Sequence, residues 1–131
     1  MIIVDSNTWA DFFNGTPTQW AERLESALES EEEIAILPII VTEVLQGFRT
    51  SRGFERARLL LTSLPMIHPA IETHVEAARM FRFLRGKGVT VRGAVDCVIA
   101  TTCIEAGAEL LSPDGDFRQI ARHTALRLCG T

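Results

Sequence analysis

The sequence predicts an α/β fold in which helices cover both faces of a parallel β-sheet. Short apolar runs typical of buried strands alternate along the chain with longer segments whose apolar residues recur at helical spacing. The repeated strand-then-helix order favours parallel strands, because a parallel pair needs a crossover connection. The length of 131 residues, without repeats or low-complexity linkers, indicates a single domain over residues 1–131.

The first half of the chain predicts three strands and four helices. Ile2–Val4 is a continuous apolar run, as expected of a buried strand. Thr16, Pro17 and Gln19 form a helix-start pattern, with threonine as the cap, proline at the first helical position and glutamine at the third. The predicted elements are a strand at 2–4, helices at 6–13 and 17–29, a strand at 34–37, helices at 39–48 and 54–64, and a short strand at 66–67.

The second half predicts three more helices and two strands. The helix at 70–85 carries apolar residues on one face and three arginines on another. The apolar residues of that face are Ile71, Val75, Ala78 and Phe81. The remaining elements are a helix at 93–106 ended by Gly107, a strand at 109–112, a helix at 117–122 and a strand at 126–128.

Composition restricts the class of protein. Three cysteines without C-x-x-C spacing favour reduced core residues over a zinc site or a disulfide, and so a reducing compartment. No apolar run is long enough to span a bilayer, and no secretion signal is recognisable, so we expect a cytoplasmic protein without membrane contact. The net charge of −4 argues only weakly against a nucleic-acid partner, because two bound Mg²⁺ would supply about four positive charges where phosphate approaches.

Four acidic residues stand where this fold would bring them together. They are Asp5, Glu43, Asp96 and Asp114. Asp5 and Asp114 follow strands, and ligands of parallel sheets bind beyond the carboxyl ends of the strands. Each acid alone has a structural explanation, such as a helix cap or a turn. Ionised carboxylates that converge without basic partners repel one another, so the set as a whole indicates a hard divalent cation and metal-assisted chemistry on phosphate.

Asp114 and Asp116 lie in one turn, two positions apart. We expect Asp114 to belong to the metal cluster, because it comes sooner after the strand. Asp116 is the weaker candidate for the metal, and is expected to cap the helix that begins near Phe117.

Four short motifs resemble those of the PIN-domain ribonucleases, and their order and spacing most resemble the VapC-type toxins of bacterial toxin-antitoxin pairs. The motifs extend from the first strand to the last helix and are Ile3–Trp9, Val41–Gly47, Asp96–Ala100 and Leu110–Phe117. The resemblance implies a three-layer α/β/α fold with a central, mainly parallel sheet. It also implies Mg²⁺-dependent endonucleolytic cleavage of RNA, with Mn²⁺ as a possible substitute.

The resemblance also implies roles for the acids, residue by residue. Asp5, Glu43 and Asp96 take the first metal position. Asp114, with Asp116 as the weaker candidate, completes the cluster or supports a second ion.

Three further residues are candidates for substrate binding. Asn7 keeps a hydrogen-bonding side chain close to the first acid. Arg92 and Arg118 are close in sequence to Asp96 and Asp116, and are candidates for holding RNA phosphates, with a solvated helix face as the alternative.

The resemblance implies three partners: an RNA substrate, a second copy of the chain in a homodimer, and a VapB-like antitoxin. The protein would contact operator DNA only through this antitoxin.

Two other classes of protein stay open. One is a catalytically silent PIN-like module that acts through an antitoxin-like partner. The other is a haloacid-dehalogenase-like phosphatase, faintly echoed by Asp5–Thr8, although such an enzyme would need a second acid where Asn7 stands.

Overall fold

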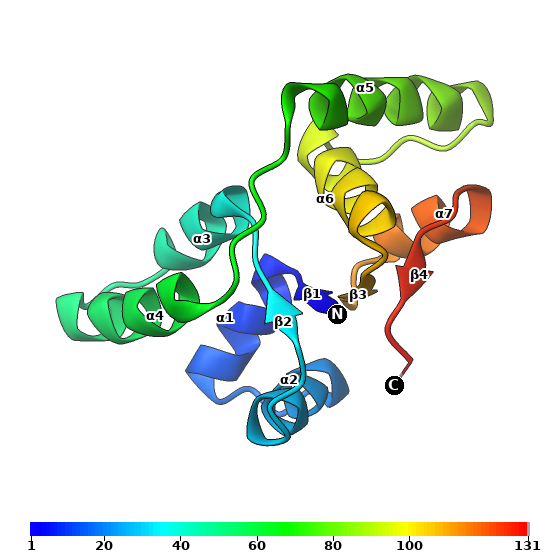
Figure 1. Cartoon of the computed structure of the whole chain (residues 1–131). Helices are drawn as coiled ribbons and strands as arrows, with labels where there is room; N and C mark the ends of the chain where they lie inside the picture. Colours follow the sequence, from blue (N-terminus) through cyan, green and yellow to red (C-terminus); the bar gives the residue numbers. More distant parts are fainter. Residues whose placement is uncertain (131) are drawn as a thin grey trace.

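The structure is a computed structural model that describes residues 1–130. It contains a parallel sheet with helices on both faces. The strand order is β2-β1-β3-β4, and every pairing is parallel, which confirms the α/β fold (Figure 1). In chain order the elements are β1 (Ile2–Val4), α1 (Ser6–Asn14), α2 (Gln19–Glu29), β2 (Ile34–Ala35), α3 (Pro38–Leu45), α4 (Ser51–Ser63), α5 (Ile71–Gly86), α6 (Ala94–Ala106), β3 (Glu109–Leu111), α7 (Gly115–His123) and β4 (Arg127–Leu128).

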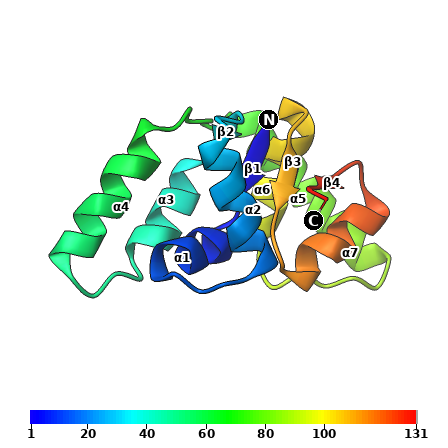
Figure 2. The same cartoon turned by 90° about the horizontal axis from the view of Figure 1, so that it is seen from below.

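The sheet lies between two helical layers. Figure 1 shows α1 and α2 on one side of the sheet and α5 and α6 on the other, and Figure 2 shows the same layers from below. Helices α3 and α4 extend beyond the β2 edge, while α7 packs near β4 at the opposite edge. This is the three-layer α/β/α arrangement expected from the sequence.

The central strand β1 explains where a site can form. Ile3 and Val4 are fully buried, as expected for a strand covered on both faces. From β1 the chain first crosses to β2 on one side, and later returns to β3 on the other, so the strand order reverses next to β1. Such a reversal leaves a crevice beyond the carboxyl ends of the two strands, here the ends of β1 and β3.

The starts of α2 and α4 differ from the sequence prediction for the same physical reason. The side chain of Thr18 accepts a hydrogen bond from the amide of Ala21 at 3.0 Å, so Thr18 and not Thr16 caps α2. Likewise Thr50 accepts from the amide of Gly53 at 3.1 Å, and α4 therefore begins at Ser51 and not at residue 54. In each case a threonine near the boundary decides the first helical turn.

The apolar face predicted for the helix at 70–85 is wrong. Ile71 is 75% exposed, whereas Thr73, Ala77 and Leu84 are the buried residues of α5. The hydroxyl of Thr73 donates to Glu105 of α6 at 2.6 Å. This hydrogen bond satisfies the polar side chain of Thr73 where it is buried.

The strands on the β2 side are shorter than predicted. Only Ile34 and Ala35 form β2, and the strand expected at 66–67 is reduced to a single parallel bridge between Ile36 and Met66. Among the residues described, no helix has the length and apolar character needed to cross a bilayer.

The cysteines are unpaired, as expected. Cys97 and Cys103 are buried in the core and Cys129 is partly buried. Burial raises the pKa of Cys97 to about 11 and that of Cys103 to about 12, so both remain neutral thiols at physiological pH.

Candidate active site

Asp5 sits at the end of β1, where the strand turns directly into α1. Its Oδ1 accepts a hydrogen bond from the amide of Thr8 at 2.9 Å, which makes Asp5 the N-cap of α1. Its Oδ2 accepts a hydrogen bond from the hydroxyl of Ser112. Asp5 is only 4% exposed, and this burial raises its pKa, while the bonds from Ser112 and Thr8 act in the opposite direction. The buried carboxylate of Asp5 is therefore held in one orientation at the carboxyl end of β1.

Asp114 holds the corresponding position after β3. Its Oδ1 accepts from the amide of Asp116 at 2.9 Å and caps α7, while its own amide donates to the Ser112 hydroxyl at 3.1 Å. The expectation that Asp116 caps this helix is therefore wrong, because α7 begins at Gly115 and places Asp116 in its first turn. Ser112 links the two acids across neighbouring strands.

Asp96 lies in the first turn of α6, a helix that has no side-chain cap. Its pKa is raised to about 6, mainly by burial and further by the negative charges of Asp114 and Asp116, whereas Arg92 lowers it. Burial and like charge therefore both disfavour the ionised form of Asp96, and Arg92 offsets only part of this effect.

Glu43 extends from α3 toward the same region. Its pKa is raised by burial and by Asp5, while the Ser6 hydroxyl lowers it. Ile40 and Val44 anchor α3 in the core, so the half-buried Glu43 is held by a rigid helix.

The four acids predicted as catalytic line one pocket of about 360 Å³, together with Asn7 and Arg92. Within this region, oxygen atoms of Asp96, Asp114 and Asp116 lie within 4.8 Å of one another. Carboxylate oxygens are the ligands that Mg²⁺ and Mn²⁺ prefer, so the donor set fits a hard divalent ion.

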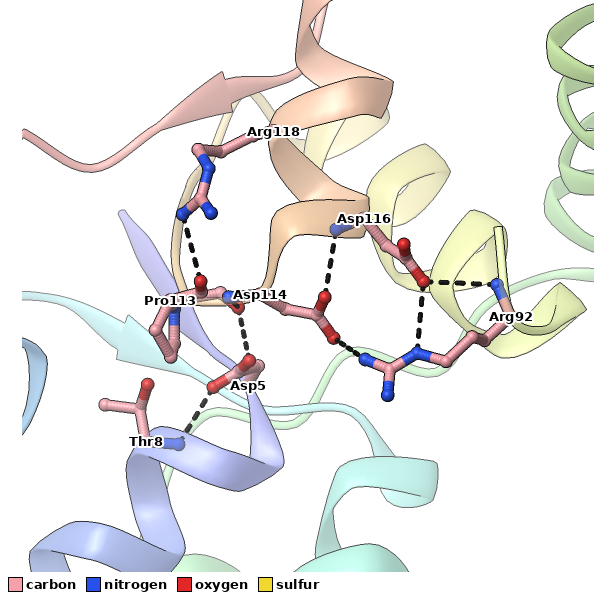
Figure 3. A network of polar contacts seen from close by, with 8 residues as sticks. Asp5, Thr8, Arg92, Pro113, Asp114, Asp116 and Arg118 are labelled. Carbon is pink, nitrogen blue, oxygen red and sulfur yellow. Dashed lines mark hydrogen bonds and ion pairs between the residues drawn. The ribbon is translucent and has the colours of Figure 1, made fainter. Parts of the chain in front are cut away.

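The predicted substrate residues divide into two kinds. Asn7 and Arg92 line the acidic pocket, and Arg92 also pairs with Asp114 and Asp116 (Figure 3). Arg118 instead donates to the carbonyl of Pro113 at 3.0 Å, beside the pocket.

Sequence reasoning missed two residues of this site, Ser112 and Ser6. Ser112 is buried and joins Asp5 to Asp114, while Ser6 lines the pocket near Glu43. A signal existed for both, because Ser6 follows Asp5 directly and Ser112 ends the strand that leads to Asp114.

Comparisons with known proteins agree with this geometry. The family model of the PIN domain matches residues 2–123. The chain is 33% identical to ribonuclease VapC11 of Mycobacterium tuberculosis over 130 residues, which cover 97% of this chain and 96% of that protein.

Two solved structures have similar folds. VapBC2 from Rickettsia felis, bound to a DNA fragment from its promoter, superposes with a TM-score of 0.77 at 21% identity, over 98% of both chains. FitAcB from Neisseria gonorrhoeae gives a TM-score of 0.77 at 18% identity, over 99% of this chain and 97% of that one.

Proposed function

Because the chain belongs to the PIN domain family and is related to VapC ribonucleases, we propose that it is a divalent-metal-dependent endoribonuclease and the toxin of a toxin-antitoxin pair. The observation that carries the proposal is the convergence of four carboxylates in one pocket, at the carboxyl ends of β1 and β3. The close approach of Asp96, Asp114 and Asp116 supports it, because carboxylate oxygens within 4.8 Å of one another suit a hard divalent ion.

Asp5, Glu43 and Asp96 would hold a first Mg²⁺ or Mn²⁺. Asp114, with Asp116 in support, would complete the cluster or hold a second ion. When bound, the ion would polarise a phosphate oxygen and lower the pKa of a bound water, which prepares the water to attack the phosphodiester bond. The protein's own part is positioning: Ser112 and the Thr8 amide fix both oxygens of Asp5.

Asn7 and Arg92 are the pocket residues proposed to contact the RNA substrate. Asn7 lines the pocket, and its amide can donate a hydrogen bond to a phosphate or ribose oxygen without adding charge. Arg92 contacts the two acids through Nε and Nη2, so its exposed guanidinium still has Nη1 to donate to a phosphate. The proposed reaction is the hydrolysis of internal phosphodiester bonds of RNA, in the cytoplasm.

The proposed protein partners are a VapB-like antitoxin and a second copy of the chain. The structure from Rickettsia felis is described as VapBC2 bound to a promoter DNA fragment, which supports an antitoxin partner. We propose that this chain meets operator DNA only through that antitoxin. An antitoxin arginine placed against the pocket carboxylates would block the site by charge-assisted hydrogen bonds.

The first prediction tests the metal-dependent mechanism. Asp96→Asn and Glu43→Gln are each expected to lower the rate of RNA cleavage by about a hundredfold or more, because each removes a charged ligand. Asp11→Asn is the matched control, because Asp11 lies on α1 outside the pocket. Cleavage is measured with labelled RNA after treatment with EDTA and after adding back Mg²⁺ or Mn²⁺. EDTA-treated protein that cleaves at the untreated rate would contradict the proposal.

The same assay separates the alternatives. A catalytically silent module would bind the antitoxin but would cleave no RNA with either metal. The phosphatase alternative finds no support in the family match, and it would be revealed by hydrolysis of small phosphate monoesters.

A further inference from the structure

Arg92 belongs to the loop between α5 and α6, and it lies against the acidic pocket. Its Nη2 donates to Asp114 Oδ2 at 2.6 Å, and its Nε donates to Asp116 Oδ2 at 3.3 Å (Figure 3). Its backbone amide donates to the same oxygen of Asp116 at 3.1 Å. Three donors of one residue thus occupy oxygen atoms of two acids, although the arginine side chain remains 77% exposed.

The oxygens that Arg92 contacts belong to a compact group of acids, of which Asp96 and Asp114 line the pocket and Asp116 lies beside them. Asp96, Asp114 and Asp116 have oxygens within 4.8 Å of one another, close enough to surround one ion. Asp114 uses Oδ1 to cap α7 and Oδ2 to accept from Arg92, so neither oxygen is without a donor. A divalent ion bound by all three acids would therefore have to share or displace the contacts of Arg92.

The pocket can be divided by these contacts. We call Asp114 and Asp116 the arginine-filled side. We call Asp5, Glu43 and Asp96 the open side, because Arg92 makes no hydrogen bond to them in the part of the chain that the structure describes.

One guanidinium does not neutralise the whole cluster. Four carboxyl groups line the pocket, and Arg92 is the one cationic side chain among the described residues that line it. Its ion pairs reach Asp114 and Asp116, and no ion pair of the described residues reaches the open side. The open side therefore still favours a cation, whereas the arginine-filled side already has one.

We propose that Arg92 is an internal cation that competes with a divalent ion for the arginine-filled side, so that the protein binds one ion, on the open side. The inference rests on the proposed function only in requiring that the pocket binds a divalent cation. Exposed ion pairs contribute little stability, so a second ion can displace Arg92 at high concentration. Arg92 thus sets how many ions the site holds.

The test is a calorimetric titration of the chelator-treated full chain with Mn²⁺. The wild-type protein is expected to bind one ion. Arg92→Gln is expected to bind a second ion, and its affinity for that ion should be about tenfold higher than in the wild-type protein, because two exposed ion pairs no longer compete. Arg118→Gln is the matched control, since it removes the same charge nearby but touches no carboxylate of the pocket.

A double variant tests whether the effect passes through the contacted acids. Adding Asp114→Asn to Arg92→Gln should abolish the gain, because the oxygen charge for which arginine and metal compete is then absent. Circular dichroism of each variant confirms that it is folded, which the exposure of Arg92 favours.

Two results would overturn the inference. In the first, Arg92→Gln binds Mn²⁺ with the same stoichiometry and affinity as the Arg118→Gln control. In the second, Arg92→Gln binds Mn²⁺ more weakly than this control, which would mean that Arg92 orients the acids for the metal. Folded wild-type protein that binds no Mn²⁺ would overturn both this inference and the metal-dependent mechanism. Protein that shows the expected change in Mn²⁺ binding but cleaves no RNA would contradict only the proposed function.

Discussion

Asp114 uses its two oxygens for different contacts, so substitution can separate its structural role from its chemical one. Oδ1 caps α7, while Oδ2 accepts from Arg92 at the pocket. Asparagine keeps an oxygen that can cap the helix, whereas alanine keeps none. We expect Asp114→Asn to lower RNA cleavage by about a hundredfold with little change in the free energy of unfolding. Asp114→Ala should also lower that free energy, by about 1 kcal/mol.

Urea denaturation and a cleavage assay on both variants provide the measurement. Equal destabilisation by asparagine and alanine would show that the carboxylate charge, and not the cap, stabilises α7.

Asp96 makes the stability of the metal-free protein depend on pH. Its pKa is raised from 3.8 to about 6, so between these values the folded state retains a proton that the unfolded state has lost. The free energy of unfolding therefore decreases as pH rises through this window. The pKa values of Asp5 and Glu43 are also raised, which adds to the same trend.

We expect Asp96→Asn to remove part of this decrease, and to be more stable than the wild-type protein at about pH 7 in EDTA. Thermal melts of both proteins from about pH 4 to about pH 7 test this expectation. Stability curves that run parallel over the whole range would exclude it.

The acids of the pocket were predictable because each carries a charge at a position where the fold needs only an apolar or neutral side chain. Ser112 was not, since a serine at the end of a strand has many ordinary uses and its partner, Asp5, is 107 positions away. The cap of α7 was misassigned because Asp114 and Asp116 both lie near the helix start, and only the observed start distinguishes them.

At the scale of elements, α2 offers a test with a control in the same segment. Thr18 caps this helix through the Ala21 amide, whereas Thr16 precedes Pro17 outside it. Thr18→Ala should lower the free energy of unfolding by about 1 kcal/mol, and Thr16→Ala by clearly less. Chemical denaturation measures both changes, and the opposite ranking would restore Thr16 as the cap.

Helical periodicity predicted α5 correctly, but not the face that it buries. The helix packs mainly on α6, and the contact includes Thr73 paired with Glu105, so a polar residue occupies the buried side while Ile71 is exposed. Hydrophobicity alone cannot identify a face whose burial depends on a hydrogen-bonding partner.

At the scale of the whole molecule, the parallel sheet was predictable but its strand order was not. Strand β2 has two residues and β1 has three, too few to encode which neighbour each strand selects. The order follows from the packing of the complete helical layers, which no single segment specifies.

The proposed homodimer can be tested at an apolar groove near the acidic pocket. Pro38, Ile39, Val95 and Val98 are among the residues lining this groove of about 350 Å³, and exposed apolar surface of this kind favours a protein contact. We expect Ile39→Arg to shift the protein from dimer to monomer, measured by size-exclusion chromatography with light scattering. Leu59→Arg is the control, because Leu59 is 62% exposed on α4 and lies outside the groove. A wild-type protein that is monomeric at all concentrations would refute the dimer.

The bond between Ser112 and Asp5 has a consequence for the timing of synthesis. It joins residues from the two ends of the chain, and β1 finds its partner β3 only after nearly all helices have been made. A chain still growing on a ribosome therefore has Asp5 and Glu43, but it lacks Ser112 and Asp114, which complete the pocket. The proposed active site therefore cannot assemble on a chain whose synthesis stops before β3.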